Sequence, residues 1–213
     1  MSTEYTTDYS SRARHDVAQL VPADSRSILE VGAGIGALGR KLAQRDSVAH
    51  DAVELNPAAA SHVSGVHGRQ WTGDTETLET DGAPHLHDCL ILADVLEHRV
   101  DPLSVLSRLC HRLRPGGHVV TGLPKVWNIA LLCRLVVQGR WDYEDAGILD
   151  RTHLRFFTRH SITAHVEGAG PFIERWEMNR DSYRGVRKAV ASIAKFFNPE
   201  FIVCQYLVLA RKP

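Results

Sequence analysis

Three glycines directly after a short apolar run limit the fold more than any other feature of this sequence. Residues 27–31 read Ser-Ile-Leu-Glu-Val, a run with the length and apolar character of a buried strand. Gly32, Gly34 and Gly36 follow, and apolar residues at helical spacing begin at Leu38. Glycines at such a turn let the backbone bend tightly and let a ligand approach where a Cβ would collide. The sequence therefore predicts a strand–turn–helix unit that binds a ligand.

Further apolar runs alternate with helical patterns along the chain. Runs typical of buried strands lie at residues 52–55, 68–71, 89–93 and 118–122, and two more at 172–178 and 201–210. Helices are predicted from Pro57, from Asp101-Pro102 through Leu113 to a stop at 115–117, over 158–168, and in a basic segment over 183–197. Alternation of this kind gives a parallel sheet covered on both faces. We therefore expect one α/β domain over residues 1–213, with a doubly wound, seven-stranded and mostly parallel sheet.

Residues 125–157 interrupt the alternation. They hold an apolar stretch and then polar and aromatic residues together. An insertion between regular elements often forms the lid or wall of a substrate site. We expect this one, after the fifth strand, to do so.

Composition excludes several function classes. Lys plus Arg number 25, as do Asp plus Glu, so no overall field attracts nucleic acid. The longest apolar run, 129–137, is broken by Arg134 and is too short to cross a bilayer, so we expect no integral membrane segment. We expect the four widely separated cysteines to be buried and reduced, which suits a cytoplasmic protein: Cys89, Cys110, Cys133 and Cys204.

Acidic side chains follow three successive strands, at the edge of an open α/β sheet where ligands bind. Glu54 ends the second strand and can accept hydrogen bonds from both hydroxyls of a ribose. Asp74 and Asp94 follow the third and fourth strands. The glycine pattern with an acid about 20 residues later also fits a dinucleotide site, so the loop alone leaves both ligands open. The three acids together suit a ligand that carries ribose, adenine and a cationic amino-acid group.

Three motifs in order resemble those of class I S-adenosylmethionine-dependent methyltransferases. They are ILEVGAGIG at residues 28–36, ADVLEH at 93–98 and LRPGG at 113–117. The resemblance covers residues 26–124 and implies a Rossmann-like methyltransferase fold whose cofactor half is this region, with residues 125–200 on the acceptor side. It implies S-adenosyl-L-methionine as cofactor, bound by Glu30, Gly32, Gly34, Gly36, Glu54, Leu55, Asp74, Asp94 and Val95.

Two later motifs resemble a bacterial subgroup linked to glycan and natural-product assembly. They are GRWDY at residues 139–143 and GILDRTHLRFFT at 147–158. The resemblance implies O-methylation of a sugar, a glycan or a small natural product. One departure is Lys125, where the resembled pattern has Asn. Two alternatives stay open: N-methylation of an amino sugar or small amine, and a non-catalytic cofactor-binding scaffold subunit.

His98 and His153 are the candidate catalytic bases. A hydroxyl acceptor must lose a proton, and imidazole has a reference pKa of about 6.5, close to the optimum for a base at neutral pH. His98 follows the fourth strand, and His153 lies in the subgroup motif on the acceptor side. Either histidine can instead cap a helix or bind a buried carbonyl.

The insertion supplies the candidate acceptor-binding residues. Trp141 and Tyr143 offer flat faces for a sugar or aromatic ring, and Arg151 and Arg155 can bind a phosphate or carboxylate. Pairing of Arg151 with Asp150 or Glu144 is the alternative. The expected partner is thus a small-molecule or glycan acceptor, and a homodimer is left open.

A metal site is weighed and not expected. Asp94, Glu97 and His98 would share one face if their segment were helical, but Mg²⁺ and Ca²⁺ need more oxygens than these residues offer. Near the N-terminus, Tyr5, Tyr9 and Arg14 are candidates to close over the cofactor's carboxylate. Between residues 180 and 195, basic residues form a local patch that a solvated helix face, an acidic carrier or a membrane surface would each explain.

Overall fold

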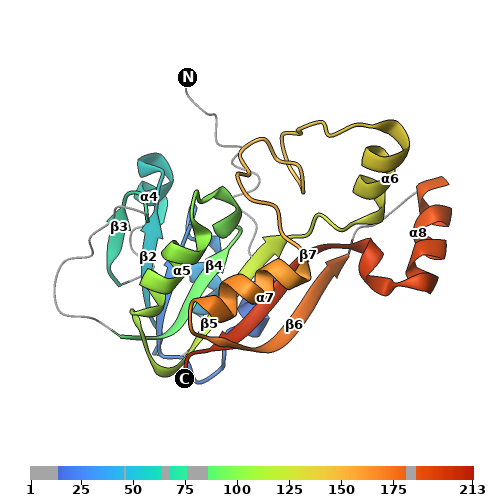
Figure 1. The fold of residues 1–213 in the computed structure, drawn as a ribbon. Coiled ribbons are helices and arrows are strands. Elements are labelled where there is room, and N and C mark those ends of the chain that lie inside the picture. Colours follow the sequence, from blue (N-terminus) through green and yellow to red (C-terminus); the bar gives the residue numbers. More distant parts are fainter. Residues whose placement is uncertain (1–13, 46, 64–67, 76–85, 181–185) are drawn as a thin grey trace.

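A computed structural model shows a single seven-stranded sheet with helices on both faces (Figure 1). It describes residues 14–45, 47–63, 68–75, 86–180 and 186–213. The sheet order is β3-β2-β1-β4-β5-β7-β6, and all neighbours run parallel except those of β7, which is antiparallel to β5 and β6. The predicted doubly wound, mostly parallel α/β fold is confirmed.

The strands are β1 (Ser27–Val31), β2 (Ala49–Glu54), β3 (Gln70–Thr72), β4 (His87–Ala93), β5 (Leu113–Pro124), β6 (Phe172–Arg180) and β7 (Val203–Arg211). The α-helices are α2 (His15–Leu20), α3 (Ala37–Leu42), α4 (Pro57–Val63), α5 (Pro102–Cys110), α6 (Ile129–Gln138), α7 (Arg159–Gly168) and α8 (Val186–Phe197). Two 3₁₀ turns complete the described elements, η1 (Leu96–His98) and η2 (Pro199–Ile202).

Alternation along the central strands divides the core into two layers. Leu29 and Leu90 point to the face that is covered by α5 and α7, with Leu106 of α5 among their neighbours. Ile28 and Ile91, one residue along each strand, point to the opposite face, which α2 and α3 cover. Because successive side chains of a strand project to opposite faces, a strand buried on both sides is apolar throughout.

The chain changes direction between β1 and β4. From β1 it proceeds outward through β2 to β3, and then crosses back so that β4 pairs with the other side of β1. The loops that follow β1 and β4 therefore lead away from one another at the carboxyl edge of the sheet. Open α/β sheets bind ligands in the crevice between such loops. This edge lies uppermost in Figure 1.

The insertion after β5 is a closed excursion that contains α6. It leaves and rejoins the sheet at one point, where Lys125 and Phe157 form a bridge and the amide of Val126 donates to the carbonyl of Phe157 at 3.0 Å. Asn128 caps the start of α6, since its side chain accepts from the amide of Ala130. Lys125 is wholly buried, and its ammonium donates to the carbonyl oxygen of Glu200 in η2. The residue that departs from the family pattern thus fixes the base of the insertion.

The predicted helix stop at residues 115–117 is wrong. Helix α5 ends at Cys110, and Leu113 already belongs to β5, where it pairs with His87 of β4. Gly117 lies inside β5, and a Cβ there would stand 2.9 Å from the carbonyl oxygen of Arg114 and 3.1 Å from that of Asp88. The glycine therefore permits a close approach between β5 and β4 and does not end a helix.

The bounds of two strands differ from the prediction by a few residues, and the prediction for the cysteines is confirmed only in part. Strand β2 begins at Ala49 rather than residue 52, and β3 covers Gln70–Thr72 rather than 68–71. None of the four cysteines forms a disulfide, but only Cys89 and Cys110 are buried, whereas Cys133 and Cys204 are partly exposed. Among the described residues, no helix has the length and apolar character needed to span a membrane.

The close approach at Gly117 gives a stability prediction. Replacement of Gly117 by Ala should lower the free energy of unfolding by about 1–3 kcal/mol, because backbone carbonyls surround the added methyl group. Urea unfolding measures the change. The control is Gly168→Ala at the end of α7, where the methyl group meets only the flexible Leu103 side chain and the change should stay within about 1 kcal/mol. Equal effects of the two substitutions would contradict the packing argument.

Candidate active site

The glycine loop lies between β1 and α3 and requires glycine for two reasons. Gly32, Gly34 and Gly36 all have positive φ angles, 76°, 56° and 78°, which residues with a Cβ rarely adopt. At Gly32 a Cβ would also stand 2.8 Å from Cγ2 of Val95, which follows β4. Glycine at position 32 therefore makes room for Val95, and the positive φ angles let the loop turn tightly between β1 and α3.

Glu54 holds this loop in place. Its side chain is buried, one carboxylate oxygen accepts from the amide of Gly34 at 2.7 Å, and the other accepts from the amide of Asn56 at 2.9 Å. The carboxylate thus ties the loop after β1 to the loop after β2. Leu55 is half exposed beside it. The predicted ribose-binding acid lies at the predicted strand end, and its side chain also preorganises the glycine loop.

Glu30 has a neighbour that the sequence did not indicate. One of its carboxylate oxygens lies 3.0 Å from Nε2 of His50, which belongs to the adjacent strand β2, and both side chains are buried. This places the Glu30 carboxylate against the β1–β2 pair. Its assignment to the cofactor stays a prediction.

Asp94 is part of a polar network. Its backbone has a φ of 58°, and its carboxylate accepts hydrogen bonds from the guanidinium of Arg14 and the side-chain amide of Gln205. Arg14 also pairs with Asp16 at 3.0 Å, and Asn179 donates to both Asp16 and Gln205. The network joins the start of α2 to the carboxyl ends of β4 and β6 and to the first residues of β7. Hydrogen bonds from Arg14 and Asn179 outweigh the effect of burial and hold the pKa of Asp16 below its ordinary value.

The network shows where Arg14 of the N-terminal segment lies, and its closure over the cofactor's carboxylate stays a prediction. The guanidinium of Arg14 contacts the Asp94 and Asp16 side chains, so it reaches the expected cofactor edge through another protein side chain. Tyr5 and Tyr9 lie outside the described residues. Asn179 and Gln205 were missed from the sequence, because Asn179 is one of several polar residues in β6 and Gln205 is a lone amide in the mainly apolar β7.

Asp74 is also paired. Its carboxylate lies 2.6 Å from a guanidinium nitrogen of Arg99, which follows η1. The pair connects the loop after β3 to the loop after β4, and it remains partly open to solvent. The sequence had indicated the acid but not its cationic partner.

The insertion docks onto η1 and thereby brings the two candidate bases together. The carbonyl oxygen of Glu97 accepts from the amides of Leu154 and Arg155 at 2.8 and 3.0 Å. The Arg155 guanidinium binds the carbonyl oxygen of Val100, so it braces the insertion. Arg151 is exposed and pairs with Asp145 at 2.6 Å. The sequence had left open an ion pair of Arg151 with Asp150 or Glu144, and the structure shows a different acid as its partner.

His98 and His153 lie in edge-to-face contact, with ring centroids 4.9 Å apart. Each Nδ1 lies 3.1 Å from a backbone carbonyl oxygen, that of Thr152 for His98 and that of Ile148 for His153. Because a carbonyl oxygen only accepts, we assign the proton of each neutral ring to Nδ1 and the free lone pair to Nε2. Burial lowers the pKa of His98 below its ordinary value, which keeps this imidazole neutral at neutral pH.

Glu97 completes a cluster with these histidines. Its side chain is buried, one carboxylate oxygen has no hydrogen-bond partner, and burial followed by the nearby charge of Asp94 raises its pKa. One ligand atom from each of Glu97, His98 and His153 falls within 4.8 Å of the others. Two imidazoles and a carboxylate form a donor set that divalent transition metals accept. Asp94 does not belong to this set. Residues 96–98 form the short 3₁₀ turn η1, and not the helix in which Asp94, Glu97 and His98 would share one face.

Aromatic rings line the insertion beside the histidines. Trp141 and Tyr143 lie 5.4 and 6.4 Å from the ring of Phe156, and His153 lies 6.4 Å from the same ring. Tyr143 is exposed and Trp141 is partly exposed, so both present ring surface to solvent. The structure therefore groups the two predicted stacking residues with a predicted base.

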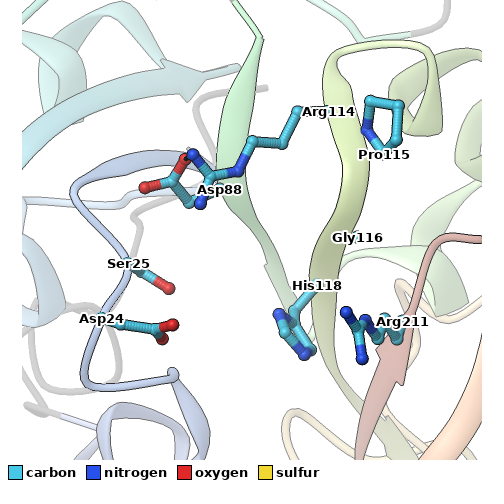
Figure 2. Close-up of a pocket in the computed structure, with 8 residues that line it drawn as sticks. All are labelled: Asp24, Ser25, Asp88, Arg114, Pro115, Gly116, His118 and Arg211. Atoms are coloured by element: carbon cyan, nitrogen blue, oxygen red, sulfur yellow. Dashed lines mark ion pairs between the residues drawn. The ribbon is translucent and has the colours of Figure 1, made fainter.

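The cavity in Figure 2 lies at the opposite edge of the sheet. It has a volume of about 420 Å³, and its lining includes Asp88 near the start of β4 and Arg114 near the start of β5. Asp88 accepts from the amides of Arg26 and Ser27 and pairs with Arg114 at 2.9 Å, so it fastens strand ends together. The residues described above line the other edge, and this cavity is no part of their site.

Comparison with known proteins places these features in a family. Residues 5–171 match the family model described as "Methyltransferase domain". A ubiquinone biosynthesis O-methyltransferase of Serratia proteamaculans is 25% identical over 178 residues, which cover 73% of this chain and 71% of that protein. One of Photorhabdus laumondii is 28% identical, with 66% of each protein covered.

Solved structures share the fold. An S-adenosylmethionine-dependent methyltransferase of Mesorhizobium loti superposes with a TM-score of 0.64 at 15% identity, over 92% of this chain and 96% of that one. A SAM-dependent methyltransferase of Archaeoglobus fulgidus gives a TM-score of 0.61 at 16% identity, over 96% and 93%.

The geometry of Glu54 predicts a loss of cofactor affinity when its carboxylate is removed. Glu54→Ala leaves the amides of Gly34 and Asn56 without their acceptor, and should raise the Kd of S-adenosylhomocysteine at least about tenfold, about 1.4 kcal/mol. Calorimetric titration measures this change. Glu174→Ala, on β6 at the opposite edge of the sheet, is the control and should bind as the unmodified protein does. Unchanged binding by Glu54→Ala would remove Glu54 from the cofactor site.

The unpartnered carboxylate of Glu97 predicts a pH-dependent stability. Its raised pKa means that the folded chain keeps this proton to a higher pH than the unfolded chain does, so Glu97 costs stability as pH rises above about 4.5. Glu97→Gln should therefore gain stability over the unmodified protein from about pH 5 to about pH 8. Urea unfolding in a chelating buffer measures the difference, with exposed Glu167→Gln as control. A constant difference across this range would contradict the raised pKa.

Proposed function

Because this chain belongs to the methyltransferase-domain family of S-adenosylmethionine-dependent enzymes, we propose that it methylates a hydroxyl group of a sugar, a glycan or a small natural product. S-adenosylmethionine is the cofactor, and it supplies an electrophilic methyl group on a sulfonium. The acceptor, the atom that receives the methyl group and the residues that promote transfer are the subjects of this proposal.

The cofactor lies along the glycine loop in this proposal. Gly32, Gly34 and Gly36 give this loop its positive φ angles, and glycines at such a turn let a ligand approach the backbone closely. Glu54 lies where the ribose hydroxyls would reach it, and Asp74 stands at the end of β3 near the expected adenine. Asp94 provides negative charge on the side where the cationic amino-acid group would lie.

The pair of imidazoles is the observation that carries transfer to a hydroxyl. As the acceptor oxygen forms its bond to the methyl carbon and the carbon–sulfur bond breaks, the hydroxyl proton must pass to a base. His98 and His153 each hold Nδ1 against a carbonyl and leave the lone pair of Nε2 available. Both belong to the edge of the sheet that carries the glycine loop, so either can take the proton there.

The aromatic insertion supports a cyclic acceptor. Trp141, Tyr143 and Phe156 form a group of rings next to His153, and such rings stack against the apolar face of a sugar or an aromatic ring. The motifs GRWDY and GILDRTHLRFFT, which resemble those of a subgroup linked to glycan and natural-product assembly, supply these residues. Relatives with 25–28% identity are named O-methyltransferases, which agrees with a hydroxyl acceptor.

Replacement of the two imidazoles tests the proposal. His98→Ala and His153→Ala are expected to bind S-adenosylhomocysteine normally, and at least one should lower kcat about 10²–10⁴-fold, because the hydroxyl loses its base. Since burial lowers the pKa of His98, the acid limb of the wild-type kcat profile should lie below about pH 6.5 if that residue is the base. Transfer of a labelled methyl group to candidate glycans, amino sugars and phenols measures these rates.

The exposed His111 at the end of α5 supplies the control. His111→Ala should keep the wild-type rate. If both site variants also keep it, the acceptor is an amine, which attacks unaided and loses its proton afterwards. If no acceptor of any class is methylated although the cofactor binds, the hydroxyl proposal fails.

A further inference from the structure

Helices α6 and α8 together expose an apolar surface at one end of the molecule, where they lie side by side (Figure 1). We call it the α6–α8 surface and define it by Val136, Val137, Ile193, Phe196 and Phe197. Their exposed fractions are 79%, 78%, 62%, 87% and 77%. Large apolar side chains that are open to water to this extent, gathered on two neighbouring helices, mark a surface that another apolar phase covers.

Helix α8 presents large apolar side chains to solvent. It buries the small residues Ala191 and Ala194, and directs Ile193, Phe196 and Phe197 to solvent. Positions i, i+3 and i+4 share one face of a helix, so these three large side chains form a single stripe. The two phenyl rings are in contact, with centroids 5.7 Å apart. The stripe of Ile193, Phe196 and Phe197 is therefore available to contact a partner.

The charge of α8 identifies the kind of partner. Its twelve residues include Arg187, Lys188 and Lys195 and no acid, whereas the whole chain is balanced at 25 charges of each sign. Apolar residues that include phenylalanine, together with basic residues, are typical of helices that lie in the interface of an anionic bilayer. We propose that the α6–α8 surface binds the surface of a membrane that contains anionic lipids.

A second copy of this chain fits the surface less well. In a two-fold dimer the same patch meets itself, so two copies of a helix that carries three basic residues and no acid would be brought together. Anionic headgroups offer the opposite charge instead, with about 1 kcal/mol for each Lys or Arg near the membrane surface. Charge complementarity therefore favours the bilayer.

The surface is continuous with the acceptor side of the site. Only residues 125–128 separate β5 from α6, and after Gly139 the chain runs directly to Trp141, then His153 and back to Phe157 at the sheet. A membrane bound to α6 and α8 would therefore lie beside the insertion. This step rests on the proposed function: the acceptor is then a hydroxyl compound carried by a membrane lipid.

Vesicle sedimentation with the full chain tests the membrane proposal without cofactor or acceptor. The protein should sediment with vesicles of phosphatidylglycerol and phosphatidylcholine, but far less with phosphatidylcholine alone, and added salt should weaken binding. Phe196→Ser with Phe197→Ser should lower the partition coefficient at least about tenfold, because two rings no longer enter the bilayer. Lys195→Glu should lower binding and reduce its dependence on salt.

Phe172→Ser is the matched control for Phe196→Ser, because Phe172 is an exposed phenylalanine on β6, outside α6 and α8. It should bind vesicles as the wild type does. All variants should keep the wild-type thermal unfolding profile and affinity for S-adenosylhomocysteine, which shows that the fold is intact. Failure of the wild type to bind anionic vesicles, or equal binding by Phe196→Ser/Phe197→Ser, overturns the proposal.

Analytical ultracentrifugation tests the alternative that a second copy of the chain covers the α6–α8 surface. Dimerisation that the double variant abolishes, without vesicle binding by the wild type, would assign the surface to a second copy of the chain and overturn the membrane proposal. Neither vesicle sedimentation nor ultracentrifugation depends on methyl transfer. A negative result in these measurements therefore rejects the membrane proposal without bearing on the proposed methylation of a hydroxyl group, which the rates of the histidine variants test.

Discussion

The carboxylate of Glu54 is the interaction on which the geometry of the ligand edge depends. It is buried and accepts from two backbone amides, those of Gly34 and Asn56, at 2.7 and 2.9 Å. Charge-assisted hydrogen bonds of this length are about twice as strong as neutral ones, and a buried amide without an acceptor costs about 1–3 kcal/mol. One side chain therefore fixes two loops that follow different strands. The positive φ angles of the glycine loop persist because this carboxylate and the close approach of Val95 leave no room for another conformation.

A second set of polar contacts closes the same edge from the N-terminal side. Arg14, at the start of α2, reaches Asp94 after β4, and Gln205 of β7 contacts the same carboxylate. Strands far apart in the sequence thus meet at one acid. The docking of the insertion on Glu97 does the same for the acceptor side, since it brings His153 into contact with His98. Each functional group is held by a contact from another element, so its orientation is a property of the assembled edge.

The fold was predictable because alternating buried strands and helices leave a strong local signal. Leu29 and Leu90 serve one layer while Ile28 and Ile91 serve the other, which makes each strand apolar throughout and easy to recognise. The stop at residues 115–117 was misread because Pro and two glycines indicate a turn in any local view. Only the carbonyls of Asp88 and Arg114 around Gly117 show that the glycine serves contact between strands.

The sequence alone determined the glycine loop, the acid at the end of β2 and the parallel sheet, because each depends on residues that are close in the chain or on a period of two or 3.6 residues. It also named both histidines, but not their relation. Tertiary structure decided that Asp94 binds Arg14 and Gln205, that Asp74 binds Arg99, and that Glu97 joins His98 and His153. Except for the neighbours Glu97 and His98, these partners are 25 to 111 residues apart, so no local pattern encodes which side chains meet. The exposure of Phe196 and Phe197 was also decided by tertiary structure: α8 contacts η2 and α6, and in this position Ala191 and Ala194 are buried while both rings are open to solvent.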